Sequence, residues 1–92
     1  MSTILTVYLK PHARPAGDRA QFMVVETGFA SFDEAIAAIA ADEIFVVRRL
    51  FTHFGAEPGL RIIHDTREVG LRGSAVDRVE VPSWKIVPED EA

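Results

Sequence analysis

The chain has 92 residues, no cysteine and a net charge of −4. This length fits one domain around a single core, and the absence of cysteine excludes disulfides and thiolate metal sites. The acidic total argues against a protein that coats DNA or RNA, because such proteins bind by neutralising phosphates.

Two strands are predicted before residue 30. Apolar and polar residues alternate over residues 3–10, which is typical of a half-buried strand, and Pro11 ends the pattern. Prolines and a glycine over residues 11–20 predict a loop. Residues 21–27 are rich in β-branched and aromatic side chains and predict a second strand, antiparallel to the first.

One segment, residues 31–41, predicts a helix. Ser31 and Glu34 stand at the spacing of a capping box, in which the hydroxyl accepts from the backbone N–H of Glu34 and the carboxylate reaches back to the N–H of Ser31. The interior is rich in alanine, the strongest helix former. An apolar stripe at helical spacing predicts the face that packs on the sheet: Phe32, Ala35, Ile36 and Ile39.

Residues 44–54 fit two structures. The β-branched and aromatic run Ile44–Val47 favours a strand over residues 44–53. A helix stays the alternative, because apolar residues also recur there at helical spacing. The choice matters for binding, since it decides whether Arg48 and Arg49 point to the same side or, as in a strand, to opposite faces.

The second half of the chain predicts short strands joined by turns. Residues 60–65 and 68–72 are expected to pair as a hairpin across the dipeptide Thr66-Arg67. A further strand is expected over residues 75–81. Residues 84–87 are then expected to fold back as a covering segment.

The predicted order β-β-α-β-β-β-β indicates an α+β fold of two layers. One capped helix packs on a mostly antiparallel sheet of about five to six strands. We expect a single domain over residues 1–87 and a disordered acidic tail over residues 88–92. No apolar run approaches the length of a membrane span, and no basic region precedes an apolar stretch at the N-terminus, so we predict a cytoplasmic protein.

The sequence carries no pattern typical of catalysis or metal binding. Its three histidines, His12, His53 and His64, do not stand at metal-ligand spacing. His64 is followed by Asp65, but neighbours in a strand point to opposite faces and cannot pair as a base and its orienting carboxylate. We therefore predict a protein that is not an enzyme and that has no cofactor and no metal site.

Candidate binding residues come from the uneven charge. Residues 1–43 carry a net charge of −3, whereas residues 44–87 carry +2 because of their arginines. Arginines that share one face would form a patch for carboxylates or phosphates, and an exposed Phe or Trp would be an interface anchor. The candidates are Arg48, Arg49, Arg61, Arg67, Arg72, Arg78, Phe54 and Trp84.

These features favour a small non-enzymatic protein–protein interaction module. Such a protein acts as a regulator, inhibitor or accessory subunit by occupying a surface of a larger partner. One form of it is a phage or mobile-element inhibitor of a host nucleoprotein complex. The alternatives are a nucleic-acid contact protein that uses the arginine-rich second half, and a small-ligand-binding α+β domain, with a homodimer possible.

Overall fold

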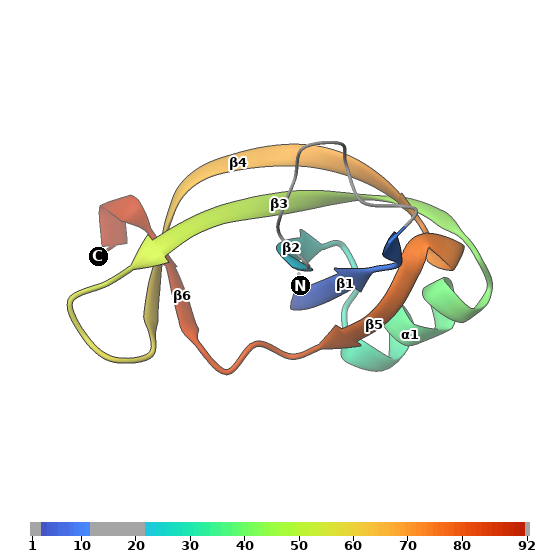
Figure 1. Ribbon diagram of the computed structural model, residues 1–92, viewed down its shortest axis with the longest axis horizontal. Coiled ribbons are helices and arrows are strands. Elements are labelled where there is room, and N and C mark those ends of the chain that lie inside the picture. Colours follow the sequence, from blue (N-terminus) through green and yellow to red (C-terminus); the bar gives the residue numbers. More distant parts are fainter. Residues whose placement is uncertain (1–2, 12–21, 92) are drawn as a thin grey trace.

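A computed structural model describes residues 3–11 and 22–91, and shows one helix packed on a six-stranded mixed sheet (Figure 1). The α+β fold that the sequence predicts is therefore confirmed. The loop predicted over residues 11–20 lies, from residue 12 on, outside the described residues. The elements are β1 (Thr3–Leu9), β2 (Phe22–Thr27), α1 (Phe32–Ala40), β3 (Ile44–Phe54), β4 (Leu60–Arg72), β5 (Val76–Glu80) and β6 (Lys85–Pro88), with short 3-10 turns at Gly73–Ala75 and Glu89–Glu91.

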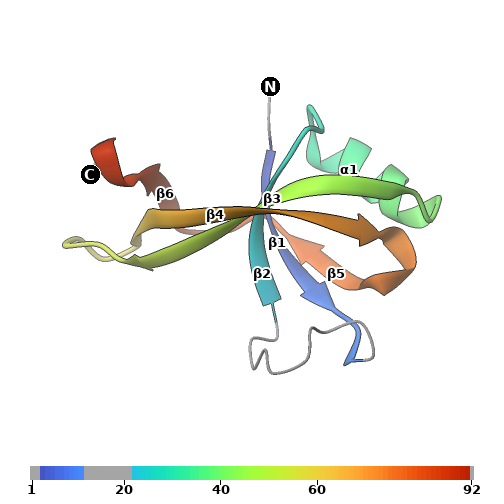
Figure 2. The same cartoon turned by 90° about the horizontal axis from the view of Figure 1, so that it is seen from above.

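The strands lie in the order β5-β1-β2-β3-β4-β6. Every neighbouring pair is antiparallel except β4 and β6, which are parallel. The first strand therefore lies between β2 and β5. Seen from above, β3 and β4 cross β1 and β2 at a large angle, which is the sign of a strongly twisted sheet (Figure 2).

Residues 44–54 form a strand, and β4 is one long strand rather than a hairpin. The two pair from Ile44 opposite Arg72 to Phe54 opposite Arg61, with a bulge beside Phe51 and Thr52. The dipeptide Thr66-Arg67, predicted as a turn, lies inside β4. Neither residue is a glycine, proline or asparagine that would start a turn, and β3 is long enough to continue the hydrogen-bonded ladder past them.

The capping box of α1 forms with one difference from the expected pattern. The Ser31 hydroxyl accepts from the backbone N–H of Glu34 at 3.2 Å. The Glu34 carboxylate reaches back one residue further than expected and accepts from the N–H of Ala30 at 2.9 Å. The start of the helix is fixed by this pair of interactions.

The helix packs on the sheet through its smallest side chains. Ala35 and Ala38 are buried, while Phe32 and Ile39 pack against the core from the sides. Ile36 was expected on this face but is 41% exposed. Alanines let the helix backbone approach the sheet closely, and a turn of about 100° per residue places Ile36 on the outer side once Ala35 faces inward.

The main core lies between α1 and one face of the sheet, which we call the helix face. The opposite face is called the far face. Three of its residues, Thr6, Val24 and Leu50, are also buried. The buried residues of the core on the helix face are Leu5, Val7, Leu9, Met23, Val25, Ala35, Val47, Leu71 and Val76.

The C-terminal segment adds a strand. Residues 85–88 were expected only to cover or to trail, but Lys85–Pro88 pairs in parallel with Leu60–Ile63 of β4. Glu89–Glu91, predicted as part of a disordered tail, forms a 3-10 turn that lies against β4. Only Val81–Trp84 connects β5 to β6, and four residues cannot cross a flat six-stranded sheet about 24 Å wide. The coiling of the sheet makes this short connection possible.

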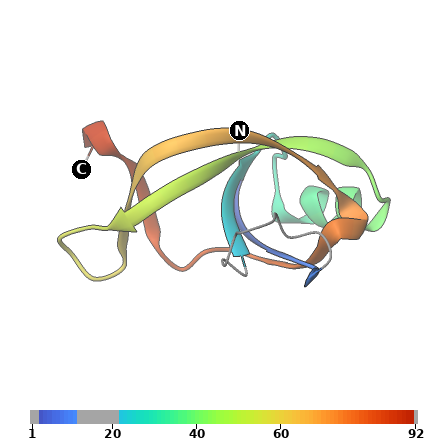
Figure 3. The same ribbon diagram turned by 45° about the horizontal axis from the view of Figure 1, so that its top comes forward.

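The hairpin of β3 and β4 extends well past the helix. We call its distal part the arm: residues 51–65, together with Trp84 and β6. In Figure 3 the arm and the C-terminus lie at one end of the molecule and α1 lies at the other. No residue of the arm is buried, although the structure describes all of them. The arm is thus a thin three-stranded sheet without a covering layer.

Candidate functional site

The structure distributes the six candidate arginines over both faces of the sheet and does not gather them in one patch. Strand alternation separates Arg48, on the far face, from Arg49, on the helix face. Arg48 forms an ion pair with Glu26 at 3.7 Å. Arg72 ends β4, at the opposite end of the hairpin from Arg61. Four of the six arginines, Arg49, Arg61, Arg67 and Arg78, instead lie in three small clusters with aromatic rings.

The first cluster lies at the arm tip, which we define as Phe54, Arg61 and Trp84. Phe54 and Arg61 are paired across β3 and β4, and Trp84 directly precedes β6 on the other side of Arg61. The guanidinium carbon of Arg61 lies 4.1 Å from the centre of the Phe54 ring and 4.4 Å from that of Trp84. Three of the eight candidates thus come together. Each such stack is worth about 0.5–1 kcal/mol at an exposed site.

Arg61 keeps unused hydrogen-bonding capacity. Its Nε atom is buried and has no hydrogen-bond partner in the part of the chain that the structure describes. No carboxylate of the described residues pairs with it. The Phe54 ring beside it is 76% exposed. The arm tip therefore presents an oriented cation and an accessible aromatic surface together.

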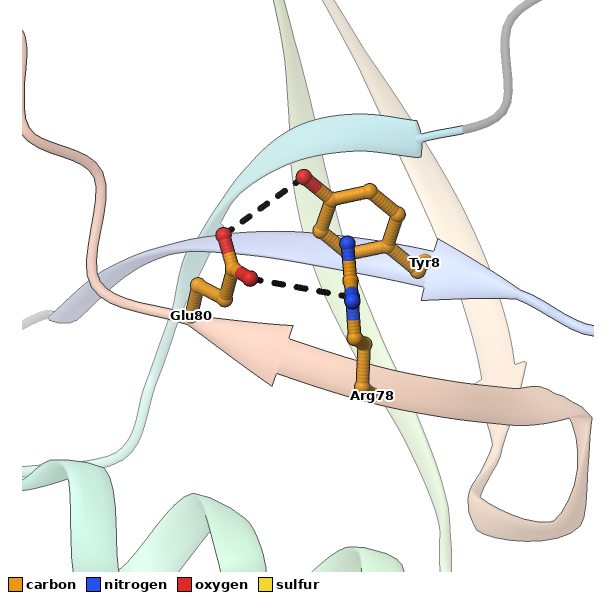
Figure 4. A network of polar contacts seen from close by, with 3 residues as sticks. All are labelled: Tyr8, Arg78 and Glu80. Carbon is orange, nitrogen blue, oxygen red and sulfur yellow. Dashed lines mark hydrogen bonds and ion pairs between the residues drawn. The ribbon is translucent and has the colours of Figure 1, made fainter.

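The second cluster is a similar stack that does contain a carboxylate. Arg78 of β5 lies over the ring of Tyr8, with its guanidinium carbon 4.1 Å from the ring centre. Glu80 accepts from the Tyr8 hydroxyl at 3.5 Å and lies 3.6 Å from Nε of Arg78 (Figure 4). These contacts are long and exposed, so they add little stability. They do give the Arg78 cation a carboxylate partner within the chain, which Arg61 lacks among the described residues.

The third cluster lies on the helix face, where the arm begins. Arg49 and Arg67 are directly opposite each other, and their guanidinium carbons lie 4.7 and 5.6 Å from the centre of the Phe51 ring. Nearby, the exposed rings of His53 and His64 lie with their centres 5.4 Å apart. Basic side chains around an aromatic ring can hold an anion that carries a flat group, such as a nucleotide.

A shallow hollow of about 270 Å³ opens where β2 ends beside β3. It is lined by Glu26, Arg48 and Glu68 on adjacent strands and by the backbone around Thr27 and Gly28. Its volume is below the range of about 300–1,000 Å³ usual for ligand pockets. Arg48 pairs with Glu26 and lies opposite Glu68 on β4, so the cation of the hollow already faces two carboxylates.

Asp42 is the one residue whose carboxyl group is clearly perturbed among the described ionisable groups. It has a left-handed backbone conformation, with φ of 55°, just after α1. Its Oδ1 accepts from the backbone N–H of Ser74 at 2.7 Å. This hydrogen bond, assisted by the charges of Arg72 and Lys10, holds the pKa of Asp42 below its ordinary value of 3.8. Asp42 therefore fastens the end of the helix to the turn before β5.

The described residues contain neither a metal site nor a membrane-spanning helix. No group of three or more His, Asp or Glu side chains in this part of the chain is arranged to hold a metal ion. Within the same residues, no helix has both the length and the apolar character that crossing a membrane requires. Asp65, which follows His64, uses Oδ1 to accept from the backbone N–H of Thr66 at 2.9 Å.

Comparison of the whole chain with protein-family models, with curated proteins and with solved structures gives no match. The site must therefore be interpreted from its own geometry. Sequence reasoning named Phe54, Arg61 and Trp84 separately but not as one stack. The stack forms because β4 pairs with β6, and the sequence did not predict this pairing.

Proposed function

We propose that this protein is a small non-enzymatic interaction module that occupies an acidic surface of a larger protein through its arm tip. It would act as a regulator, inhibitor or accessory subunit of that partner. We also propose a cytoplasmic location, which the cysteine-free sequence supports.

The observation that carries the proposal is the unmatched guanidinium of Arg61. The cation is held between Phe54 and Trp84, and its Nε is buried without a partner among the described residues. Trp, Tyr and Arg dominate the binding energy of protein interfaces when they lie in desolvated clusters. A carboxylate from a partner would give the Arg61 guanidinium an ion pair like the one that Glu80 gives Arg78. Because Nε of Arg61 is buried, this carboxylate would bind the terminal nitrogens of the group.

The lack of a cover over the arm also supports a protein partner. The arm has no buried residue, so its aromatic side chains contribute little to its own folding. A partner that packs against Phe54 would remove an exposed aromatic ring from water. Because Arg has a planar group that pairs bidentately with carboxylates, the favoured contact on the partner is an Asp or Glu side chain.

The test is affinity capture from a lysate of the source cells, with and without nuclease, using the wild-type chain and two variants. Arg61→Ala removes the unmatched cation. Arg78→Ala is the matched control, because it removes a stacked arginine that already has a carboxylate. The affinity of any captured partner is then measured by titration with each purified variant.

We expect a partner that survives nuclease and whose Kd rises about 30-fold or more with Arg61→Ala, the effect of a typical hot-spot residue. Arg78→Ala should change the Kd less than about threefold, as expected for a residue outside the hot spot. Arg61→Lys should also weaken binding, because lysine keeps the charge but loses the flat stacking group. A partner held equally by wild type and Arg61→Ala would overturn the proposal.

A second candidate function, contact with a nucleic acid, is supported by the third cluster. Arg49 and Arg67 flank the Phe51 ring on the helix face of the sheet. Single-stranded nucleic acids bind to such surfaces through stacking and phosphate contacts. Fluorescence anisotropy with a labelled single-stranded oligonucleotide tests this hypothesis between about 50 and 200 mM salt. If binding rests on about one or two phosphate contacts, the affinity should fall severalfold over this range. Binding absent at the lowest salt would exclude it.

A further inference from the structure

One edge of the sheet is open over most of β4. β6 pairs with β4 only along Leu60–Ile63, and no other described strand lies along the outer edge of β4 beyond that stretch. In Figure 1 β4 forms the upper margin of the molecule, and the other strands and α1 lie below it. An open edge presents unpaired backbone N–H and C=O groups and is a template for another strand.

The part of this edge available for pairing begins after the C-terminal turn. Glu89–Glu91 continues from β6 and lies against β4. The remaining stretch, Thr66–Arg72, is seven residues of regular strand, or about 23 Å at 3.3 Å per residue. It carries exposed charges of both signs, Arg67, Glu68 and Arg72, of which Glu68 and Arg72 share the far face.

We propose that Glu68–Arg72 pairs antiparallel with the same residues of a second copy of this chain, about a two-fold axis at Gly70. Directly opposed residues of an antiparallel pair share a face of the sheet. A two-fold axis perpendicular to the sheet keeps each residue on its own face. Only registers centred on a residue, not between two residues, satisfy both conditions.

Charge favours one register from this set, because centring on Val69 or Leu71 opposes no two charged residues and only the centre at Gly70 gains attractive pairs. Centring on Arg67 or on Glu68 places two identical charges directly opposite each other, which is unfavourable. Centring on Thr66 would need the edge next to the turn Glu89–Glu91. Centring on Gly70 places Glu68 of each copy opposite Arg72 of the other, on the far face, so one interface gains two opposite-charge pairs.

The side chains around the axis also fit this register. Gly70 carries no side chain and has open space where a Cβ would be, so no side chains meet on the far face at the axis. On the helix face, the partly buried Val69 would lie opposite Leu71 of the second copy. The pairing would join two six-stranded sheets into one continuous sheet of twelve.

The test uses two charge reversals, Glu68→Arg and Arg72→Glu, and sedimentation velocity over a range of concentrations. Each variant alone places like charges opposite each other twice in the proposed register. In a one-to-one mixture, the arginine introduced by the first variant lies opposite the glutamate introduced by the second. The unchanged Arg72 of the first variant also lies opposite the unchanged Glu68 of the second. Both opposite-charge pairs are therefore present again. Asp77→Lys is the control, because it changes an exposed charge on β5, away from this edge.

We expect wild type and Asp77→Lys to form dimers at high concentration. Each single reversal should raise the dimer dissociation constant at least tenfold. The one-to-one mixture of the two reversals should form dimers again. Circular dichroism checks that both variants fold, because Glu68→Arg lies opposite Arg48 in its own hairpin and Arg72→Glu replaces a cation near Asp42. A wild-type chain that stays monomeric at every concentration would overturn the proposal. So would reversals without effect, or a mixture that does not recover the dimer.

Discussion

The two ends of the β3–β4 hairpin both carry apolar residues but have different surroundings. At the helix end, Val47 and Leu71 are buried against α1 and the neighbouring strands. At the arm, the apolar residues Phe51, Ile62 and Ile63 stay partly exposed, because no second layer covers them. The helix end of the hairpin therefore stabilises the protein, whereas the arm presents apolar and basic groups to solvent.

The largest expected effect is Leu5→Ala in the core. Leu5 is 1% exposed, and its removal leaves a cavity beneath α1, so we expect a loss of about 2–5 kcal/mol in the free energy of unfolding. Phe54→Ala in the arm is the matched comparison. It removes a larger side chain but one that is mostly in water, so we expect less than about 1 kcal/mol. Urea unfolding measures both, and equal losses would contradict the division into two regions.

Gly73→Ala should follow. A Cβ at this position would lie against the carbonyl oxygen of Ile39 and near the Cα of Asp42, both of which are backbone atoms that cannot rotate away. We expect a loss of about 1–3 kcal/mol from overpacking, measured by thermal unfolding. Gly70→Ala is the control, because the space around Gly70 is open. If the two variants had the same stability, the close contact between α1 and the turn before β5 would be disproved.

Ser31→Ala should have a smaller effect on the same helix. It removes the hydroxyl that accepts from the N–H of Glu34, and the loss of such a cap costs about 1 kcal/mol. Ser31→Asp retains an acceptor and should keep nearly the wild-type Tm. A Tm that falls equally in both variants would show that the cap does not explain the effect.

The smallest expected effect is that of Asp42→Asn, and it depends on pH. The folded state lowers the pKa of Asp42 below 3.8, so the ionised carboxylate stabilises the fold above that pH. This contribution is lost as the pH falls through the lowered pKa. We therefore expect Asp42→Asn to lower the Tm slightly at pH 7, and the difference from wild type to vanish at strongly acidic pH. A difference that grows on acidification would contradict this sign.

The layers of the fold could be predicted from the sequence because local signals mark them. Alternation predicted β1, the capping box predicted the start of α1, and β-branched residues predicted β3. The continuous β4 could not be predicted, because the ladder with β3 overrides the weak preference of the dipeptide Thr66-Arg67. Ile36 was placed on the wrong side because hydrophobicity alone does not reveal that alanines make the closest contact.

The candidate site was harder to predict because it depends on pairing between distant strands. Arg61 and Trp84 meet only because β6 lies in parallel beside β4. No periodicity in residues 84–88 specifies that partner or its direction. The residue types that bind were therefore visible in the sequence, whereas their arrangement was not.

The place of β1 between β5 and β2 in the sheet has a consequence for synthesis. Its partner on one side, β2, follows within the first 27 residues, but its partner on the other side is β5. Tyr8 and Glu80, which contact each other, are 72 residues apart in the chain. A ribosome must release almost the entire polypeptide before this ladder can close, so the nascent chain carries a half-paired first strand for most of its translation.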